Sequence, residues 1–288
     1  MMTTKNYLSI YAKSFNWSGF FLPKKTYFKC SVLYDFCRTI DNIADRNIDL
    51  EIKKIELKEF RENFEKKDKN NSVIRNMWDL MDGKNISKKI VDDLFDGVNS
   101  DLKKEVRIKT EKELLIYSYR VAGTVGLMMA KIFGIKKKES LQRAIDLGIA
   151  MQLTNIARDV IEDKKKNRSY LIENSKDIFT SIKNMILRAD TFYDSAFEGI
   201  KDIPLNCRFS IIVARRIYRQ IGKKILKKND IENYRKSGKI YVSNFGKMVQ
   251  TLLSLKDLIT LFFIKNKKYQ RETEYNLINE DISLNERI

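Results

Sequence analysis

The chain has 288 residues, 43% of them hydrophobic and 11% aromatic, so it can bury a core, and wholesale disorder is excluded. Lysine and arginine exceed aspartate and glutamate by 56 − 38 = 18, but this charge is dispersed, without a basic tail or an aromatic-basic stripe, which argues against a nucleic-acid binder. Three cysteines without C-x-x-C spacing support neither a disulfide framework nor a zinc site, and they fit the reducing cytoplasm.

Residues that break helices are scarce, because Pro23 and Pro204 are the only prolines. Long segments rich in Ile, Leu, Lys and Glu therefore predict an all-α chain, and the absence of linkers predicts one domain over residues 1–288. Polar segments at about Asn167–Ser175 and Lys227–Tyr241 are expected to be loops, and the charged tail after Tyr269 is expected to fray. The expected helices cover about Tyr7–Phe15, Pro23–Asp45, Leu50–Lys67, Ser72–Met81, Ser87–Asp101, Thr110–Ile132, Glu139–Lys165, Ile178–Ile200, Asn206–Lys227 and Val242–Lys265.

No stretch of 18 uninterrupted apolar residues marks a membrane span. The nearest approach is Leu252–Ile264, which Lys256 and Asp257 interrupt. We expect this segment to be an amphipathic helix with its apolar face buried, and a role at a membrane surface is the alternative.

The first chemical signal is an acidic helix face with a phenol and a guanidinium. Tyr34, Arg38, Asp41 and Asp45 follow steps of 4, 3 and 4, which keep them on one face of a helix. Arginine can grip phosphate oxygens with two hydrogen bonds. The same pattern also arises on a solvated face with an Arg–Asp pair, so it does not prove function alone.

A second polar face recurs more than a hundred residues later and continues for four helical turns. Its uncharged amides, in a chain that otherwise uses lysine at exposed positions, argue against a merely solvated face. Carboxylates without histidine or cysteine favour Mg²⁺, which is commonly held by a few carboxylates plus substrate phosphates. The residues of this face are Gly148, Gln152, Asn155, Asp159, Glu162 and Asp163.

Between the two acidic helices, the segment Tyr117–Gly126 combines hydroxyl groups with small residues. Gly123 and Gly126 each cost about 1 kcal/mol inside a helix. They fit a kink or a ligand that passes close to the backbone, and close packing between helices explains them equally well.

These motifs together resemble the squalene/phytoene synthase family. Tyr34-x-Phe36-Cys37-Arg38-x-x-Asp41-x-x-x-Asp45 is similar to its first aspartate motif. Gln152-Leu153-Thr154-Asn155-Ile156-x-Arg158-Asp159-x-x-Glu162-Asp163, followed by Arg168-x-Tyr170-Leu171, is similar to its second. The resemblance covers about Tyr11–Val249. Ile161, Asn167 and Asn42 depart from the family pattern without removing a metal-ligand position.

The resemblance implies an isoprenoid-synthase helical bundle around a central cavity, with the two aspartate-bearing helices facing each other. It implies Mg²⁺, or alternatively Mn²⁺, bound by Asp41, Asp45, Asn155, Asp159 and Asp163. The four aspartates, Tyr117 and Tyr218 are the expected catalytic residues. The expected substrate-binding residues are Ser14, Phe15, Gly19, Tyr34, Arg38, Val121, Gly123, Gly148, Gln152, Asn155, Arg158 and Arg168.

The resemblance also implies a reaction, the head-to-head condensation of two prenyl diphosphates through a cyclopropylcarbinyl diphosphate. Gly19 stands where fifteen-carbon enzymes of the family tend to have a bulky aromatic residue, which favours two geranylgeranyl diphosphates and phytoene as the product. Squalene or dehydrosqualene synthesis from farnesyl diphosphate is the alternative, with NADPH needed only for squalene. A catalytically silent assembly factor is the non-enzyme alternative, and the retained aspartates argue against it. A cytoplasmic protein is expected; peripheral contact with a membrane and the oligomeric state stay open.

Overall fold

The computed structural model of the chain describes residues 13–172, 177–264 and 268–288, and at Lys13 and Ser14 it describes the backbone alone. The described residues are almost entirely helical, so the expected all-α class is confirmed. The helix expected at Tyr7–Phe15 lies mostly outside these residues, and the first described helix is α2, Lys13–Gly19.

The helices follow each other through short connections. Within the described residues, two very short strands, β1 and β2, pair in parallel, which the sequence did not predict. The further elements are α3 (Lys24–Asp45), α4 (Leu50–Glu65), α5 (Ser72–Lys84), α6 (Lys88–Ser100), β1 (Val106–Arg107), α7 (Glu111–Ser118), η1 (Tyr119–Gly123), α8 (Thr124–Ile132), α9 (Lys138–Lys165), β2 (Arg168–Ser169), α10 (Ile178–Gly199), η2 (Ile200–Asp202), α11 (Leu205–Leu226), α12 (Ile231–Lys236), α13 (Asn244–Phe263), α14 (Glu272–Ile282) and η3 (Leu284–Glu286).

Local side-chain chemistry sets many of the helix starts. Asp49 accepts hydrogen bonds from the first backbone N–H groups of α4, and Asn71 does the same for α5. Thr110 and Glu113 form a reciprocal capping box at the start of α7. Pro23 and Pro204 stand at the N-caps of α3 and α11, so each proline directly precedes a helix.

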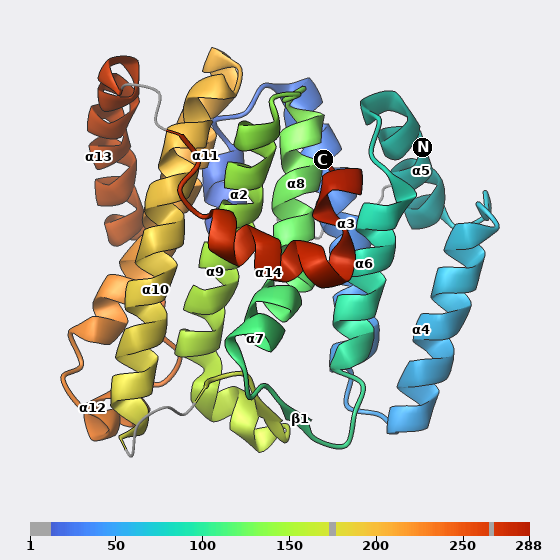
Figure 1. Cartoon of the computed structure of the whole chain (residues 1–288), viewed down its shortest axis with the longest axis horizontal. Coiled ribbons are helices and arrows are strands. Elements are labelled where there is room, and N and C mark those ends of the chain that lie inside the picture. The colour runs from blue at the N-terminus through green and yellow to red at the C-terminus, as the bar shows by residue number, and fades with distance from the viewer. Residues whose placement is uncertain (1–12, 173–176, 265–267) are drawn as a thin grey trace.

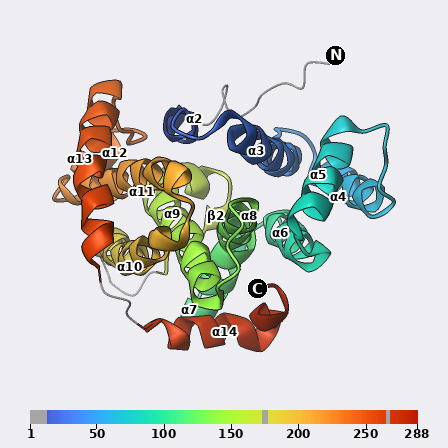
Figure 2. The same cartoon turned by 90° about the horizontal axis from the view of Figure 1, so that it is seen from above.

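The long helix α9 lies at the centre of the bundle. It packs against α8, α10 and α11. Seen from above, α2 and α3 run along one side, α4 to α6 lie at one end, and α10 to α13 lie at the other (Figure 2). The ends of α3 and α9 point towards the edge of the molecule at which β1 is labelled (Figure 1). The two acidic motifs are thereby brought to the same end.

The segment Tyr117–Gly126 contains both a kink and close helix packing. Tyr119–Gly123 forms a π-helical turn between α7 and α8, as such insertions often do near functional sites. A Cβ atom on Gly126 would lie 2.2 Å from the Ala144 carbonyl oxygen of α9. Here glycine lets two helix backbones approach.

Two segments expected to lack helices contain one. The loop expected at Lys227–Tyr241 includes α12. The tail expected to fray after Tyr269 contains α14, which buries Tyr275, Ile278 and Ile282, so that expectation is wrong for Glu272–Ile282. The spacing of 3 and 4 residues between these side chains is an apolar period that the many charged neighbours obscure.

None of the helices in the described residues combines the length and the apolar character that a membrane span requires. The helix expected to bury the apolar residues of Leu252–Ile264 is present as α13, but most of its large apolar side chains are exposed, so the expected burial is wrong.

Candidate active site

The two acidic motifs meet at one end of the fold. Asp41 and Asp45 lie near the end of α3, and Asp159 and Asp163 lie near the end of α9. Arg168 on β2, three residues after α9, donates a hydrogen bond from Nη1 to Asp45 Oδ1 at 3.2 Å. This contact spans 123 residues of sequence and ties the second motif to the first.

A further carboxylate, Asp101, lies between the two motifs. It follows α6 and accepts hydrogen bonds from the hydroxyls of Tyr117, at 3.0 Å, and Tyr170, at 2.6 Å. The two phenol rings stack with centroids 4.7 Å apart. The charge of Asp101 contributes to raising the pKa of both Asp41 and Asp163, so it lies close to both helices.

Sequence analysis missed Asp101, because one aspartate after a helix forms no pattern. Tyr170 belongs to the motif quoted above but was given no role, although its place two residues after Arg168 was the available signal.

Burial and like charge act together on the carboxylates. Burial raises the pKa of Asp41 to about 7, and the charge of Asp45 adds to this effect against the Arg38 guanidinium. Burial likewise raises the pKa of Asp163 to about 7, and the charge of Asp159 adds to it. Carboxylates whose pKa is raised by burial and by like charge are common at functional sites.

Two cations contact Asp159, one from its own helix α9 and one from the loop that follows α12. Arg158 donates from Nε to Oδ1 at 2.8 Å and from Nη2 to Oδ2 at 2.6 Å. Lys239 Nζ lies 3.2 Å from Asp159 Oδ1 and 2.7 Å from Glu162 Oε2. Sequence analysis missed Lys239, which stands in a segment expected to be a polar loop.

Two phenols lie at the boundary between the polar end and the interior. Burial raises the pKa of Tyr34 to about 12 and that of Tyr218 to about 12, so both hydroxyls keep their protons at neutral pH. The charge of Arg158 opposes this rise at Tyr218, which places Tyr218 near the second acidic motif. Its ring also lies 5.1 Å from the ring of Phe15.

One polar atom at this boundary lacks a partner. Asn155 Nδ2 lies 3.5 Å from Gln152 Oε1. In the described part of the chain no donor reaches the buried Asn155 Oδ1. A buried acceptor without a hydrogen bond is costly unless a ligand meets it, and an amide oxygen suits Mg²⁺.

The ligand set fits a magnesium ion that is shared with phosphate. Within the described residues, no three histidine, cysteine or carboxylate side chains are grouped closely enough to form a metal site by themselves. Mg²⁺ usually keeps several waters and is bound by one or two carboxylates together with substrate phosphates. Asp41, Asp45, Asp159, Asp163 and Asn155 carry the oxygen donors that such a site uses.

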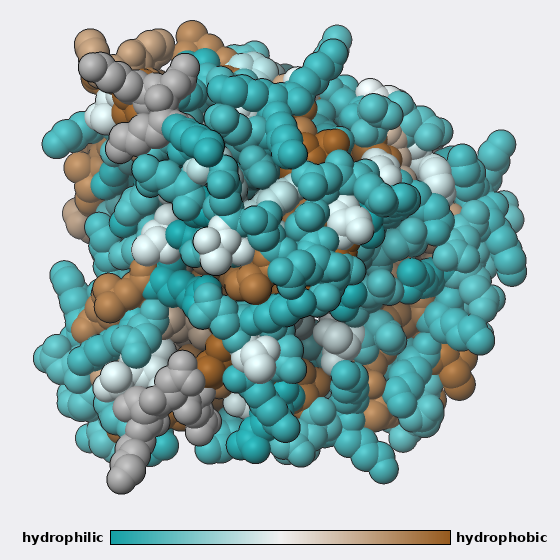
Figure 3. All heavy atoms as spheres, viewed as in Figure 1, coloured by the Kyte–Doolittle hydropathy of each residue, from teal (hydrophilic) through white to brown (hydrophobic). Residues whose placement is uncertain are grey.

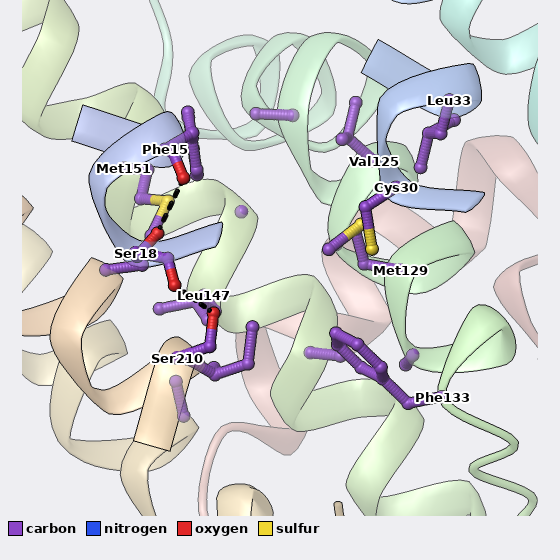
Figure 4. Close-up of a pocket in the computed structure, with 18 of the residues that line it drawn as sticks. Phe15, Ser18, Cys30, Leu33, Val125, Met129, Phe133, Leu147, Met151 and Ser210 are labelled. Atoms are coloured by element: carbon purple, nitrogen blue, oxygen red, sulfur yellow. Dashed lines mark hydrogen bonds between the residues drawn. The ribbon is translucent and has the colours of Figure 1, made fainter. Parts of the chain in front are cut away.

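A cavity of about 330 Å³ leads from this polar end into the core. Asp41, Gln152 and Asn155 line it, and so do Phe133, Ile200 and other apolar side chains. Figure 4 shows Phe15, Leu147 and Met151 on one side of the cavity and Leu33, Val125, Met129 and Phe133 on the other. The walls are thus mostly hydrocarbon, whereas one end carries charge.

The part of the wall that α2 forms is fixed by hydrogen bonds. Ser210 Oγ of α11 donates to the Ser18 carbonyl at 2.8 Å, and Trp17 Nε1 donates to Thr251 Oγ1 of α13 at 3.0 Å. Gly19, at the end of α2, lines the cavity. The role expected of Gly19 in setting the donor chain length stays a prediction.

Most of the expected site residues lie together at this end. Arg38 lies beside Asp41 and Tyr34, where its charge opposes the rise in pKa that burial causes, and Tyr117 contacts the site through Asp101. Ser14 lies outside the residues whose side chains the structure describes. The expected residues that line the cavity itself are Phe15, Gly19, Tyr34, Asp41, Val121, Gly148, Gln152, Asn155 and Tyr218.

Gly123 and Gly148, two of the expected substrate-binding residues, lie at close contacts between segments of the fold. A Cβ atom on Gly148 would lie 2.2 Å from the Ala122 carbonyl oxygen, so this glycine permits contact between helix backbones, although the residue also borders the cavity. A Cβ atom on Gly123 would meet Tyr119 and Ile145 at 3.0 and 3.1 Å, and Gly123 is not part of the cavity wall.

Comparison with known proteins agrees with this geometry. Over 158 residues the chain is 42% identical to the 15-cis-phytoene synthase of a Paracoccus species, covering 50% of this chain and 51% of that protein. It is 27% identical over 248 residues to the 15-cis-phytoene synthase of Pantoea ananas, covering 76% of this chain and 80% of that protein. For several of these curated relatives, the match spans about half of their length.

A solved structure of a dehydrosqualene synthase in complex with a ligand superimposes with a TM-score of 0.73 at 27% identity, covering 88% of this chain and 94% of that chain. The model of the family described as squalene/phytoene synthase matches residues 9–245, which include both aspartate motifs. The chain belongs to the squalene/phytoene synthase family.

Proposed function

We propose that this protein joins two molecules of geranylgeranyl diphosphate head to head and forms phytoene in a Mg²⁺-dependent reaction. The observation that supports this most is the meeting of the α3 and α9 carboxylates at one end of a long apolar cavity. A prenyl diphosphate has the same division, with a charged head and a hydrocarbon tail.

The metal would be bound by Asp41, Asp45, Asp159, Asp163 and Asn155. When bound, Mg²⁺ supplies positive charge that neutralises the diphosphate as it leaves, and Mn²⁺ has the same preference for oxygen ligands.

The chain's own cations and phenols orient the head group. Arg158 and Lys239 contact Asp159, and Arg168 contacts Asp45, in positions from which each can also reach phosphate oxygens. Tyr34 and Tyr218 keep their protons at neutral pH, so they can donate hydrogen bonds to the diphosphate.

The reaction proceeds in two steps, and each releases one diphosphate and one proton. In the first, the C1–O bond of one substrate breaks, and the C2–C3 double bond of the second attacks the allylic cation; loss of a proton closes a cyclopropane ring. In the second, the remaining diphosphate leaves, the cyclopropylcarbinyl cation rearranges to a C1–C1′ bond, and loss of a proton gives phytoene.

The apolar wall keeps water away from these cations. Water would trap an allylic cation as an alcohol, so a cavity lined by side chains such as Leu33, Met129 and Leu147 protects the reaction. The rings of Phe15 and Tyr218, whose centroids are 5.1 Å apart, can stabilise a nearby cation through their faces.

The twenty-carbon donor is favoured by the length of the cavity. Its wall includes Asn155 and Ser140, fifteen residues apart on α9, a rise of about 22 Å along the helix. Gly19 adds no side chain to this wall.

The second candidate is dehydrosqualene or squalene synthesis from farnesyl diphosphate, because the superimposed structure is a dehydrosqualene synthase. NADPH belongs only to the squalene case. A catalytically silent assembly factor of the same fold is the candidate that a complete lack of turnover would support.

Product analysis tests the proposal directly. Purified protein with Mg²⁺ should convert geranylgeranyl diphosphate to phytoene, and chelation with EDTA should stop the reaction. A product formed only from farnesyl diphosphate, with or without NADPH, would reject the twenty-carbon assignment. No hydrocarbon from either donor would reject the enzyme.

We also infer that the protein works as a peripheral protein at a membrane surface. Phytoene has no polar group, so it leaves the enzyme most favourably for an apolar phase.

A further inference from the structure

Helix α13 is inverted relative to an ordinary surface helix, because it turns polar side chains inwards and apolar side chains outwards. Lys247, Gln250 and Ser254 are buried, and Ser254 is 0% exposed. Leu252 and Ile259 are 62% and 60% exposed. The exposed large apolar side chains of this helix are Phe245, Met248, Leu252, Leu253, Leu255, Ile259, Phe262 and Phe263.

Contacts on the inner face fix this orientation. Arg216 of α11 donates from Nε to Gln250 Oε1 at 3.2 Å and from Nη1 to Asp257 Oδ2 at 2.7 Å. Trp17 of α2 donates to Thr251 at 3.0 Å. Rolling the helix to bury its leucines would break all three hydrogen bonds, so the apolar face is held outwards by the fold.

The exposed side chains form one continuous stripe, which we call the α13 stripe. Phe245, Met248, Leu252, Leu255, Ile259 and Phe262 follow steps of 3, 4, 3, 4 and 3. Such steps keep to one side of a helix, and the stripe extends over about 25 Å. Helix α13 lies at the outer edge of the bundle (Figure 2), and hydrophobic atoms gather over it at the upper left of Figure 3.

A patch of this kind needs a cover. Contiguous apolar surface of this extent is rare on monomeric soluble proteins and marks contact with a partner or a membrane. Ile52 and Ile55 on α4 are also exposed, but together with Ile48 they make a patch of only three residues.

The net charge of the chain favours an anionic bilayer over a second copy as the partner of the α13 stripe. The chain carries a formal net charge of +18, so two copies repel each other, whereas an anionic bilayer attracts each of them. Asp257, the only carboxylate of α13, faces inwards to Arg216, and the exposed charge of this helix is Lys256. Repulsion between carboxylates and anionic head groups is therefore absent from the α13 stripe.

The stripe also lies close to the catalytic cavity. η2 packs against α13, and Ile200 of η2 lines the cavity. Gly19 lines it as well, and the next residue, Phe20, is 83% exposed. The wall of the cavity therefore lies next to the exposed apolar surface.

We propose that α13 lies flat in the surface of an anionic phospholipid bilayer, with the α13 stripe inserted among the acyl chains. Amphipathic helices bind in this way when apolar burial and attraction to anionic lipid act together. The delivery of a hydrocarbon product to the bilayer rests on the proposed function, whereas binding of α13 to the bilayer does not.

Vesicle flotation tests the surface. The full-length protein should float with vesicles of phosphatidylcholine containing about one-third phosphatidylglycerol, and it should bind pure phosphatidylcholine vesicles more weakly. The double variant Leu252→Glu/Ile259→Glu should lose roughly tenfold or more in vesicle affinity, because it places two carboxylates in the stripe. The matched control, Ile52→Glu/Ile55→Glu on α4, makes the same change in charge and should bind as wild type does.

Two outcomes would overturn the proposal. One is equal binding by wild type, variant and control, or no binding by any of them. The other is a wild-type protein that is a dimer in light scattering, an α13 variant that is a monomer, and no vesicle binding by either. In that case a second copy of the chain covers the stripe. Circular dichroism should show the same helix content in all three proteins.

A separate assay keeps this inference apart from the proposed function. In detergent micelles the two double variants should turn over prenyl diphosphate as wild type does, since neither changes the site. Vesicle binding without activity on any prenyl diphosphate would reject the proposed function and leave the docking surface in place.

Discussion

At the scale of single residues, burial and like charge act on the same carboxylates. The pKa of Asp41 and that of Asp163 are both raised to about 7, chiefly by burial. Keeping such groups ionised costs free energy in the folded protein, so stability alone does not explain why they are buried together. The arrangement is explained if a cation and a diphosphate meet the carboxylates during turnover.

We therefore predict that Asp41→Ala and Asp163→Ala each lower turnover by roughly a thousandfold or more, since each removes a ligand that stabilises the leaving diphosphate through the metal. Both variants should stay folded without Mg²⁺, because each substitution removes a buried carboxylate that destabilises the folded protein. Steady-state rates and urea unfolding measure the two effects. Asp79→Ala, at an exposed position of α5, is the control and should leave the rate unchanged; near-wild-type rates for both site variants would contradict the assignment.

Gly19 decides chain length if it forms the floor of the donor site. Phenylalanine at this position would fill space in a wall that now has no side chain there. We predict that Gly19→Phe lowers turnover of geranylgeranyl diphosphate far more than that of farnesyl diphosphate, because apolar fit contributes about 1–3 kcal/mol per methylene. Assays on both donors give the ratio of the two turnover rates. A loss of active protein lowers both rates equally and leaves this ratio unchanged. An unchanged ratio would place the end of the chain elsewhere.

At the scale of elements, the π-helical turn η1 and α9 approach so closely that only glycine fits at their contact. We predict that Gly148→Ala destabilises the protein by about 1–3 kcal/mol or more, because its Cβ would lie 2.2 Å from the Ala122 carbonyl oxygen, and backbone must move. Gly83→Ala on α5 is the matched control: no atom lies within 4 Å of its Cβ, so alanine should stabilise by about 0.5–1 kcal/mol. Urea unfolding of both variants measures the difference, and equal stability would show that the helices can separate cheaply.

Sequence alone predicted the elements with strong local signals. Helices α3 and α9 follow from their periodicity, and their polar faces indicated the site because carboxylates at steps of 3 and 4 share a face. The orientation of α13 was not predictable in this way. Periodicity identifies an apolar face, but only tertiary contacts such as Arg216 with Gln250 and Asp257 decide that this face points outwards.

Residues that join the site through long-range contacts were also beyond the sequence. Asp101 becomes part of the site because Tyr117 and Tyr170, from two separate segments, converge on it. Lys239 reaches Asp159 across 80 residues of sequence from the loop after α12, which has no periodic pattern. Pattern analysis finds residues that share one helix face, and it has no access to partners that the fold brings together.

At the scale of the whole molecule, the C-terminal segment is tied to the bundle by two buried carboxylates. Arg287 Nε and Nη2 donate to Asp93 at 3.0 and 3.1 Å, and Tyr119 of the π-helical turn donates to the same carboxylate at 2.9 Å. Tyr269 donates to Asp146 of α9 at 3.0 Å. Helix α14 of this segment packs against α7 and runs across the front of the bundle in Figure 1.

Asp146 makes this tie sensitive to pH. Burial raises its pKa to about 7, although Ser195 and Tyr269 donate hydrogen bonds to it and the charges of Arg271 and Arg143 oppose the rise. Between its ordinary value of 3.8 and 7, the folded protein holds a proton that the unfolded chain has lost. The contribution of Asp146 to stability is therefore greatest below pH 4 and falls as the pH rises to 7.

We predict that Asp146→Asn removes this slope. Relative to wild type, the variant should gain about 2–3 kcal/mol in free energy of unfolding between pH 5 and pH 8, since the wild type alone pays for ionising a buried carboxyl over that range. Urea unfolding of both proteins at the two pH values, without Mg²⁺, gives the difference, and the other titrating groups cancel because both proteins contain them. An amide keeps the shape of the carboxyl, so hydroxyl contacts from Ser195 and Tyr269 can persist. A stability difference that is the same at both pH values would mean that Asp146 is ionised in the folded protein throughout, balanced by Arg143 and Arg271.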